Sequence, residues 1–124
     1  MVSETRSLMF SEEEVLCALK VVMQQRGDAP PSAAVPELTL AETKDGELEA
    51  RITHTPILDG DVSTYTFTEA EVGAALILYC MRLGIPLPKK VDKSVELRGD
   101  RAALIIRMET DVRRQAPVKL PADA

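Results

Sequence analysis

The single histidine, His54, and the two aspartates that follow it, Asp59 and Asp61, have the side-chain types needed for acid–base chemistry. An imidazole beside a carboxylate can accept a proton from a substrate and return it later in the reaction. His54 has no cysteine or carboxylate at metal-ligand spacing near it in the sequence, which favours a structural or solvated histidine. An enzyme that uses these three residues, in a groove between two structural units, is the third of three functional hypotheses.

The tripeptide Asp59-Gly60-Asp61 also resembles the beginning of a calcium-binding loop. Such a loop supplies further oxygen ligands at fixed positions and ends on a glutamate, and this pattern does not follow here. Aspartate and glycine are also typical turn residues. We therefore expect a tight turn between two strands at this point.

Two cysteines, Cys17 and Cys80, lie within segments of helical pattern. Small buried thiols are the expected interpretation for both, with a nucleophile as the alternative for Cys80. Two cysteines inside helices do not indicate a disulfide framework, so a reducing, cytoplasmic location fits best.

Other motifs that carry chemistry are missing from the sequence or have a structural explanation. There is no glycine-rich phosphate loop, no zinc-ligand spacing and no Gly-x-Ser-x-Gly elbow. Arg-Gly-Asp occurs at residues 26–28 and 98–100, where its glycine is expected to end a helix and to open a turn, respectively. We predict no catalytic residue, no cofactor and no metal site.

A basic stretch between residues 82 and 107 is the feature that points to binding, because it has seven basic and three acidic side chains. The candidate partner- or anion-binding residues are Lys89, Lys90, Lys93, Arg98 and Arg101. If the loop and turn that carry them lie close together, they form a patch for an acidic partner or a phosphate backbone. The alternative is a solvated surface that balances the acidic first half of the chain.

The charge of the chain is divided unevenly between its halves. The net charge of the 124 residues is −5, of which residues 1–66 carry −7 and residues 67–124 carry +2. An acidic chain with only 3% aromatic residues is not expected to bind nucleic acid. Halves of opposite sign can attract each other within one molecule or head to tail between molecules. No signal peptide or membrane segment is predicted.

The elements that position these residues occur twice. At an offset of 57 residues, eight of the 22 positions from 10 to 31 are identical, where composition alone predicts about one or two. Each copy opens on the same pattern: phenylalanine, a Ser11 or Thr68 cap, and a glutamate three residues after the cap. This pattern predicts a capping box, and the phenylalanine is placed for a hydrophobic staple.

Two helices are expected to follow these caps. The first presents Val15, Leu19 and Val22 on one face, and Gly27 is expected to end it. The second, from Glu69 to about Leu83, is apolar nearly all round. Such a helix is either the central helix of the fold or packs across a subunit interface.

Alternating patterns predict strands around the helices. One hairpin turns at Asp45-Gly46 and a second at Gly99-Asp100. Strands are also expected before each helix, at about residues 5–10 and 62–67. The tail from Gln115 is expected to be disordered.

The sequence therefore predicts one α+β domain over residues 1–114, built from two βαββ units at about 5–54 and 62–109. The expected architecture is an antiparallel sheet packed against two helices, with approximate internal two-fold symmetry. The first functional hypothesis is a non-enzymatic protein-interaction or assembly module, whose partner is an unknown protein or a second copy in a homo-oligomer. The second hypothesis is an accessory factor that binds an anion or nucleic acid through the basic stretch.

Overall fold

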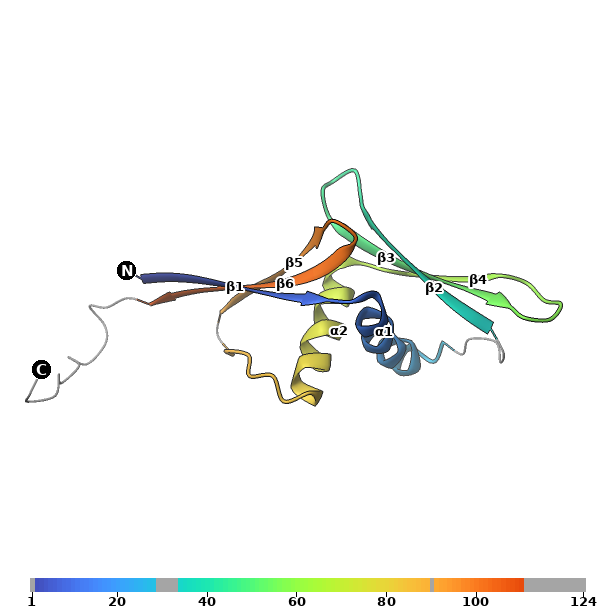
Figure 1. The fold of residues 1–124 in the computed structure, drawn as a ribbon, viewed down its shortest axis with the longest axis horizontal. Helices are drawn as coiled ribbons and strands as arrows, with labels where there is room; N and C mark the ends of the chain where they lie inside the picture. The colour runs from blue at the N-terminus through green and yellow to red at the C-terminus, as the bar shows by residue number, and fades with distance from the viewer. Residues whose placement is uncertain (1, 29–33, 90, 111–124) are drawn as a thin grey trace, which may run out of the picture.

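A computed structural model describes residues 2–28, 34–89 and 91–110 of the chain (Figure 1). These residues form two helices and six strands, which confirms the predicted α+β class. In chain order the elements are β1 (Val2–Phe10), α1 (Glu12–Arg26), β2 (Ala34–Glu42), β3 (Leu48–Pro56), β4 (Ser63–Phe67), α2 (Glu69–Arg82), β5 (Asp92–Arg98) and β6 (Arg101–Thr110).

The strands form two antiparallel three-stranded sheets, so the expectation of one sheet was wrong. The strand orders are β1-β6-β5 in sheet A and β2-β3-β4 in sheet B. In Figure 1 the two sheets diverge to either side, and the two helices lie together beneath them. Alternation along a strand indicates which side chains face the core, but it does not determine which distant strands pair.

Each sheet combines strands from both βαββ units. The strand before α1 pairs with the hairpin that follows α2, and the strand before α2 pairs with the hairpin that follows α1. The registers correspond, because Phe10 is opposite Ala102 in sheet A and Phe67 is opposite Ala50 in sheet B. Neither unit therefore completes a sheet from its own strands.

The predicted helix caps are confirmed. The Ser11 hydroxyl accepts a hydrogen bond from the Glu14 N–H at 3.2 Å, and the Glu14 carboxylate accepts one from the Ser11 N–H at 2.9 Å. Thr68 and Glu71 form the same capping box on α2. Gly27 ends α1 at a φ of 80°, a conformation that glycine adopts without steric cost.

The core lies where the helices meet the inner faces of both sheets. Both phenylalanines that precede the caps, and the valine at the fourth position of each helix, are almost fully buried: Phe10, Val15, Phe67 and Val72. The end of α1 also meets the start of α2, where Arg26 pairs with Glu71 and its guanidinium lies 4.6 Å from the centre of the Phe67 ring. Neither helix is long and apolar enough to cross a membrane.

The outer face of sheet A has a buried apolar centre. In sheet A, Ala103 and Ile105 of the central strand β6 are buried although they face away from the helices. Arg98 on β5 donates a hydrogen bond to the Ser7 hydroxyl on β1 at 3.2 Å, so its side chain crosses β6. This crossing helps to cover the apolar centre of the outer face.

Candidate functional site

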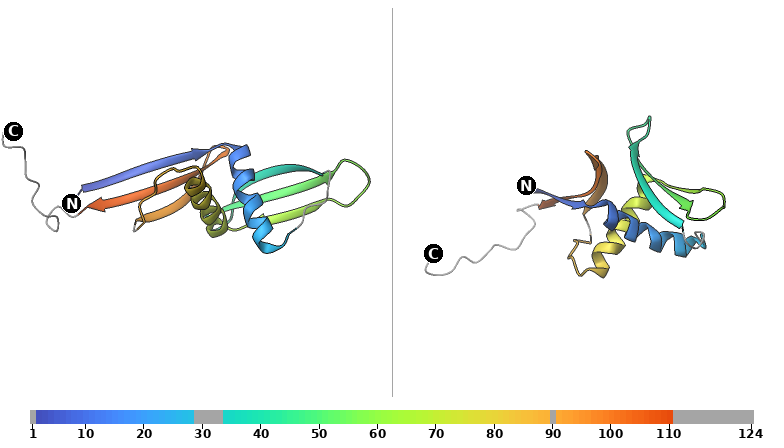
Figure 2. Two further views of the ribbon diagram at one scale, coloured as in Figure 1. Left: turned by 90° about the horizontal axis from the view of Figure 1, so that it is seen from below. Right: turned by 45° about the vertical axis from the view of Figure 1, so that its right-hand side comes forward.

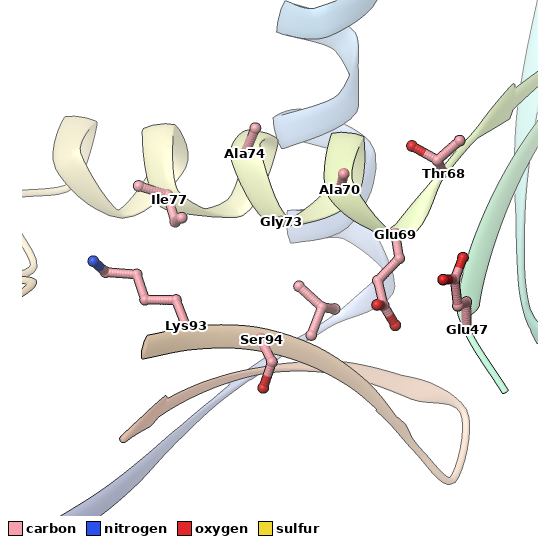
Figure 3. Close-up of a pocket in the computed structure, with 10 residues that line it drawn as sticks. Glu47, Thr68, Glu69, Ala70, Gly73, Ala74, Ile77, Lys93 and Ser94 are labelled. Carbon is pink, nitrogen blue, oxygen red and sulfur yellow. The ribbon is translucent and has the colours of Figure 1, made fainter. Parts of the chain in front are cut away.

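A groove of about 480 Å³ lies between α2 and β5 (Figure 3). Its α2 side begins at the helix cap and follows one helix face. Its lining residues are Glu47, Thr68, Glu69, Ala70, Gly73, Ala74, Ile77, Lys93, Ser94 and Val95. Most of the lining side chains from α2 are small. They leave open space between the helix and β5.

Gly73 allows α2 and β5 to approach each other closely. A Cβ at this position would lie 3.2 Å from Cγ2 of Val95, which is closer than nine in ten such contacts in proteins. The equivalent residue of the first unit is Leu16, whose side chain packs against the core. The groove therefore depends on a difference between the two units.

One end of the groove is acidic. A second cavity of about 300 Å³ adjoins the groove, shares Glu69 and Val95 with it, and is also lined by Glu42 and Leu97. The Glu69 carboxylate accepts a hydrogen bond from the Leu48 N–H at 3.0 Å, which fixes its position at the start of β3. We call Glu42, Glu47 and Glu69 the acidic cluster.

The other end of the groove carries Lys93. Figure 3 shows the Lys93 ammonium directed away from Glu69. Among the ion pairs of the described residues, none involves Lys93. The groove therefore has opposite charges at its two ends and an apolar middle.

β5 forms the border of sheet A, because it pairs with β6 alone. Arg98 and Arg101 flank a two-residue turn, and the pair that flanks such a turn exchanges hydrogen bonds. Hydrogen-bonded and non-hydrogen-bonded pairs alternate along an antiparallel ladder. The backbone N–H and C=O groups of Lys93, Val95 and Leu97 therefore point away from β6, toward an edge that pairs with no strand but has β2 and β3 nearby.

The equivalent edge of sheet B is blocked. The registers of the two hairpins place Pro36 of β2 at the position of Lys93 in β5. Proline has no N–H to donate and is one of the residues that protect exposed strand edges. β5 contains no proline, so it keeps the donor that β2 lacks.

The basic residues predicted to form one patch lie on different surfaces. Lys90 is outside the described residues, and Lys89 lines a separate cavity with Asp92 and Arg107. Lys93 faces the groove, whereas Arg98 and Arg101 are opposite each other on the outer face of sheet A.

Lys93 and Arg98 are five residues apart, or about 17 Å along a strand. The structure thus brings Arg98 and Arg101 together but leaves Lys93 on the opposite face. Binding of an anion by these residues stays a prediction.

His54 is buried on the inner face of β3, with 5% of its surface exposed. Burial lowers its pKa below the usual 6.5, and the nearby positive charge of Lys20 lowers it further. Its buried Nδ1 has no hydrogen-bond partner among the described residues. It is a core histidine, at the register position that Ile106 occupies in β6.

The two aspartates do not join His54. The cavity beside it has a volume of about 130 Å³ and is lined by Lys20, Met23, Gln24 and Asp28, without Asp59 or Asp61. Residues 57–62 form a six-residue loop, so the expected tight turn was wrong. In the described part of the chain, no group of three or more His, Cys, Asp or Glu side chains is arranged to hold a metal ion.

The two cysteines differ in exposure. Cys80 is fully buried, and burial raises the pKa of its thiol, with a smaller contribution from the charge of Glu14. Cys17 is exposed on α1, so the expectation of a buried thiol was wrong for this residue. Cys17 lies on the side of α1 that faces solvent, which the helical pattern alone did not show.

The groove itself was missed by sequence reasoning. A comparison of the two units contained a signal for it, namely glycine in place of Leu16 and lysine in place of Pro36. Comparison with known protein families, curated proteins and solved structures found no match to this chain.

Proposed function

We propose that this chain is a protein-interaction module that binds an extended protein segment as an additional strand on β5. The observation that carries the proposal is the coincidence of a free strand edge with an open groove beside it. Added strands gain affinity from backbone hydrogen bonds, and specificity from side chains that enter neighbouring pockets.

We expect the bound segment to lie along the unpaired edge of β5. Its backbone would pair with the N–H and C=O groups of Lys93, Val95 and Leu97. Alternate side chains of an extended segment point to the same face, so every second one would enter the groove beside Gly73 and Ala74. Small or slender apolar side chains fit the space there, and a basic side chain fits the acidic cluster.

The contrast between the two units supports the same conclusion. The first unit fills the equivalent helix position with Leu16 and blocks the equivalent edge with Pro36. The second unit has Gly73 and Lys93 at these positions, at a cost in helix propensity of about 1 kcal/mol for a mid-helix glycine. A purely structural role for the second unit would not require an open edge.

The exposed face of α2 adds to this surface. Val72, Leu76 and Cys80 are buried, but Ala74 is exposed and Met81 is 66% exposed. α2 packs against α1 and against strands of both sheets, which accounts for its buried apolar side chains. Its exposed apolar face remains available for contact with another subunit, in line with the proposed function.

The substitution Lys93→Pro tests the proposal, because it copies Pro36 to the equivalent edge position. The new proline removes an N–H that points away from β6, so the ladder within sheet A is retained. Light scattering of the purified protein, and affinity capture from the lysate of its source, would compare wild type, K93P and K93Q. K93Q removes the charge but keeps the N–H.

We expect K93P to lose an association that wild type shows and that K93Q largely keeps. Circular dichroism would check that both variants are folded. The proposal would be wrong if K93P had the same molar mass in solution as wild type and captured the same proteins from the lysate. It would also be wrong if wild type were strictly monomeric and captured nothing.

A further inference from the structure

We infer that the strand added to β5 is β5 of a second copy of this chain, antiparallel and centred on Val95. This inference rests on the proposed function and names its partner. Pairing of two edge strands would join two copies of sheet A across a two-fold axis, with both α2 helices on the same side. Backbone register, charge and apolar surface all favour this partner.

The backbone of β5 restricts how two copies can pair. Free backbone groups belong to Lys93, Val95 and Leu97, so these residues must face one another across the dimer axis. A register centred on Val95 places Lys93 opposite Leu97 of the second copy, in both directions. It also uses the whole of β5, because Val95 is the middle residue of Asp92–Arg98.

Charge distinguishes this register from the two nearest that also satisfy the backbone. Centred on Val95, the outer face has no like charges opposite each other, because Ser94 faces Glu96 and Asp92 faces Arg98 of the second copy. A register centred on Ser94 would place Asp92 opposite Glu96, and one centred on Glu96 would place the two Glu96 residues opposite each other. Like charges directly opposite each other destabilise a strand pair, so the Val95 register is favoured.

The inner face is also complementary. Lys93 of one copy would lie beside Leu97 of the other, next to the acidic cluster that lines the cavities there. Lys93 forms no ion pair within the described residues of its own chain. The acidic half of one chain would thus meet the basic half of another, in both directions.

Apolar surface completes the interface. Ala70, Ala74 and Ile77 line the groove on α2, and Met81 lies one turn further along the same helix face with 66% of its surface exposed. Figure 2 shows α2 beside β5 at one border of sheet A. A two-fold axis through Val95 would bring this face of α2 toward the same face of α2 in the second copy.

A protective function for Lys93 makes the opposite prediction. A lysine that points inward from an edge strand can protect that edge from association. Loss of such a protective lysine strengthens association, whereas loss of a lysine that pairs with the acidic cluster weakens it. Charge variants of Lys93 separate the two functions.

The first experiment uses complementary charge reversals and light scattering. In a K93E dimer, the glutamate at position 93 would face the acidic cluster of the partner chain. In an E42K/E47K dimer, the lysines at positions 42 and 47 would face Lys93 of the partner chain. Each variant alone should therefore be monomeric. Mixed in equal amounts, they should form a heterodimer. Control reversals with the same charge changes lie on the outer face of sheet B: Arg51→Glu and E37K/E49K.

We expect K93E to raise the dimer dissociation constant at least about tenfold, because close charge pairs at interfaces are strongly coupled. Mixing K93E with E42K/E47K should restore the dissociation constant of wild type. The control variants should dimerise like wild type. A K93E that dimerises like wild type, or a K93Q that dimerises more tightly, would overturn the inference.

A second experiment tests the register. In a C17S background, S94C and E96C chains are mixed and oxidised, because the Val95 register places residue 94 opposite residue 96 of the partner. Disulfide-linked dimers should form mainly between the two different variants. Equal or greater linkage in S94C alone would contradict the register.

The outcomes distinguish this inference from the proposed function. A strictly monomeric wild type that captures another protein, and loses it in K93P, overturns the homodimer but keeps β5 as a binding edge. A wild-type dimer that K93P does not affect overturns both.

Discussion

Gly73 of α2 faces Val95 of β5 so closely that a Cβ on the glycine would lie 3.2 Å from Cγ2 of the valine. This contact sets the distance between a helix and an edge strand. It also leaves the open groove beside β5, because the neighbouring α2 positions carry the small side chains of Ala70 and Ala74. One missing side chain therefore links the packing of the second unit to its proposed binding surface.

Gly73→Ala is expected to lower the free energy of unfolding by about 1 kcal/mol. Alanine gains about 1 kcal/mol in helix propensity, but overpacking costs about 1–3 kcal/mol, and the β-branched Val95 cannot easily turn aside. In a Val95→Ala background the same change should be neutral or stabilising. Denaturant unfolding of the four proteins measures this coupling, and equal effects of G73A in both backgrounds would show that the contact is unimportant.

Stability is expected to fall below pH 6.5 because of His54. Its folded-state pKa is lowered by burial and by Lys20, so the unfolded chain binds a proton first as the pH falls. This contribution to stability is complete above pH 6.5 and is lost as the pH falls toward the folded-state pKa.

His54→Ile introduces the residue found at the equivalent position, Ile106. It removes a buried nitrogen without a partner, whose cost is about 1–3 kcal/mol, and should raise stability. It should also flatten the pH dependence of stability below pH 6.5. Chemical denaturation of both proteins across this range is the measurement, and parallel pH profiles would refute the prediction.

The two thiols should react at very different rates. Cys17 is exposed, whereas Cys80 is fully buried and burial disfavours its reactive thiolate. A colorimetric thiol reagent should modify one cysteine per native chain quickly and both in denaturant. The C17S variant should lose the fast phase, and rapid modification of native C17S would show that Cys80 is accessible.

Removal of either helix cap should weaken the whole domain. Ser11→Ala and Thr68→Ala should each cost about 1 kcal/mol of unfolding free energy, since each hydroxyl accepts the N–H of the residue three positions later. Thr66→Ala, on the outer face of β4, is the matched control and should cost less. Both cap variants should unfold in one cooperative transition, because each sheet contains strands of both units; two separated transitions would contradict this.

Much of the local structure follows from short stretches of sequence. The capping boxes, the helix end at Gly27 and the turn at Gly99-Asp100 were all predicted and are confirmed. These features depend on residues within a few positions of one another, so the sequence contains all the interacting groups. The predicted hairpins and the strands before each helix are also present.

The pairing of strands that are far apart in the sequence could not be predicted from local patterns. The sequence shows that β1 and β6 are strands, but not that Phe10 lies opposite Ala102 or that the two units exchange their first strands. Such pairings compete with others of similar pattern, and the outcome depends on how the complete core packs. The burial of His54 and the exposure of Cys17 follow from that packing.

The repeated capping motif at the start of each helix can be recognised from the sequence alone. The caps at Ser11 and Thr68 depend only on residues within three positions of them. The groove between Gly73 and Val95 is different. It exists because folding brings residues 22 positions apart into contact and leaves β5 at the border of sheet A. Sequence alone therefore established the two units, whereas the three-dimensional packing of the strands determined which of them has an open edge.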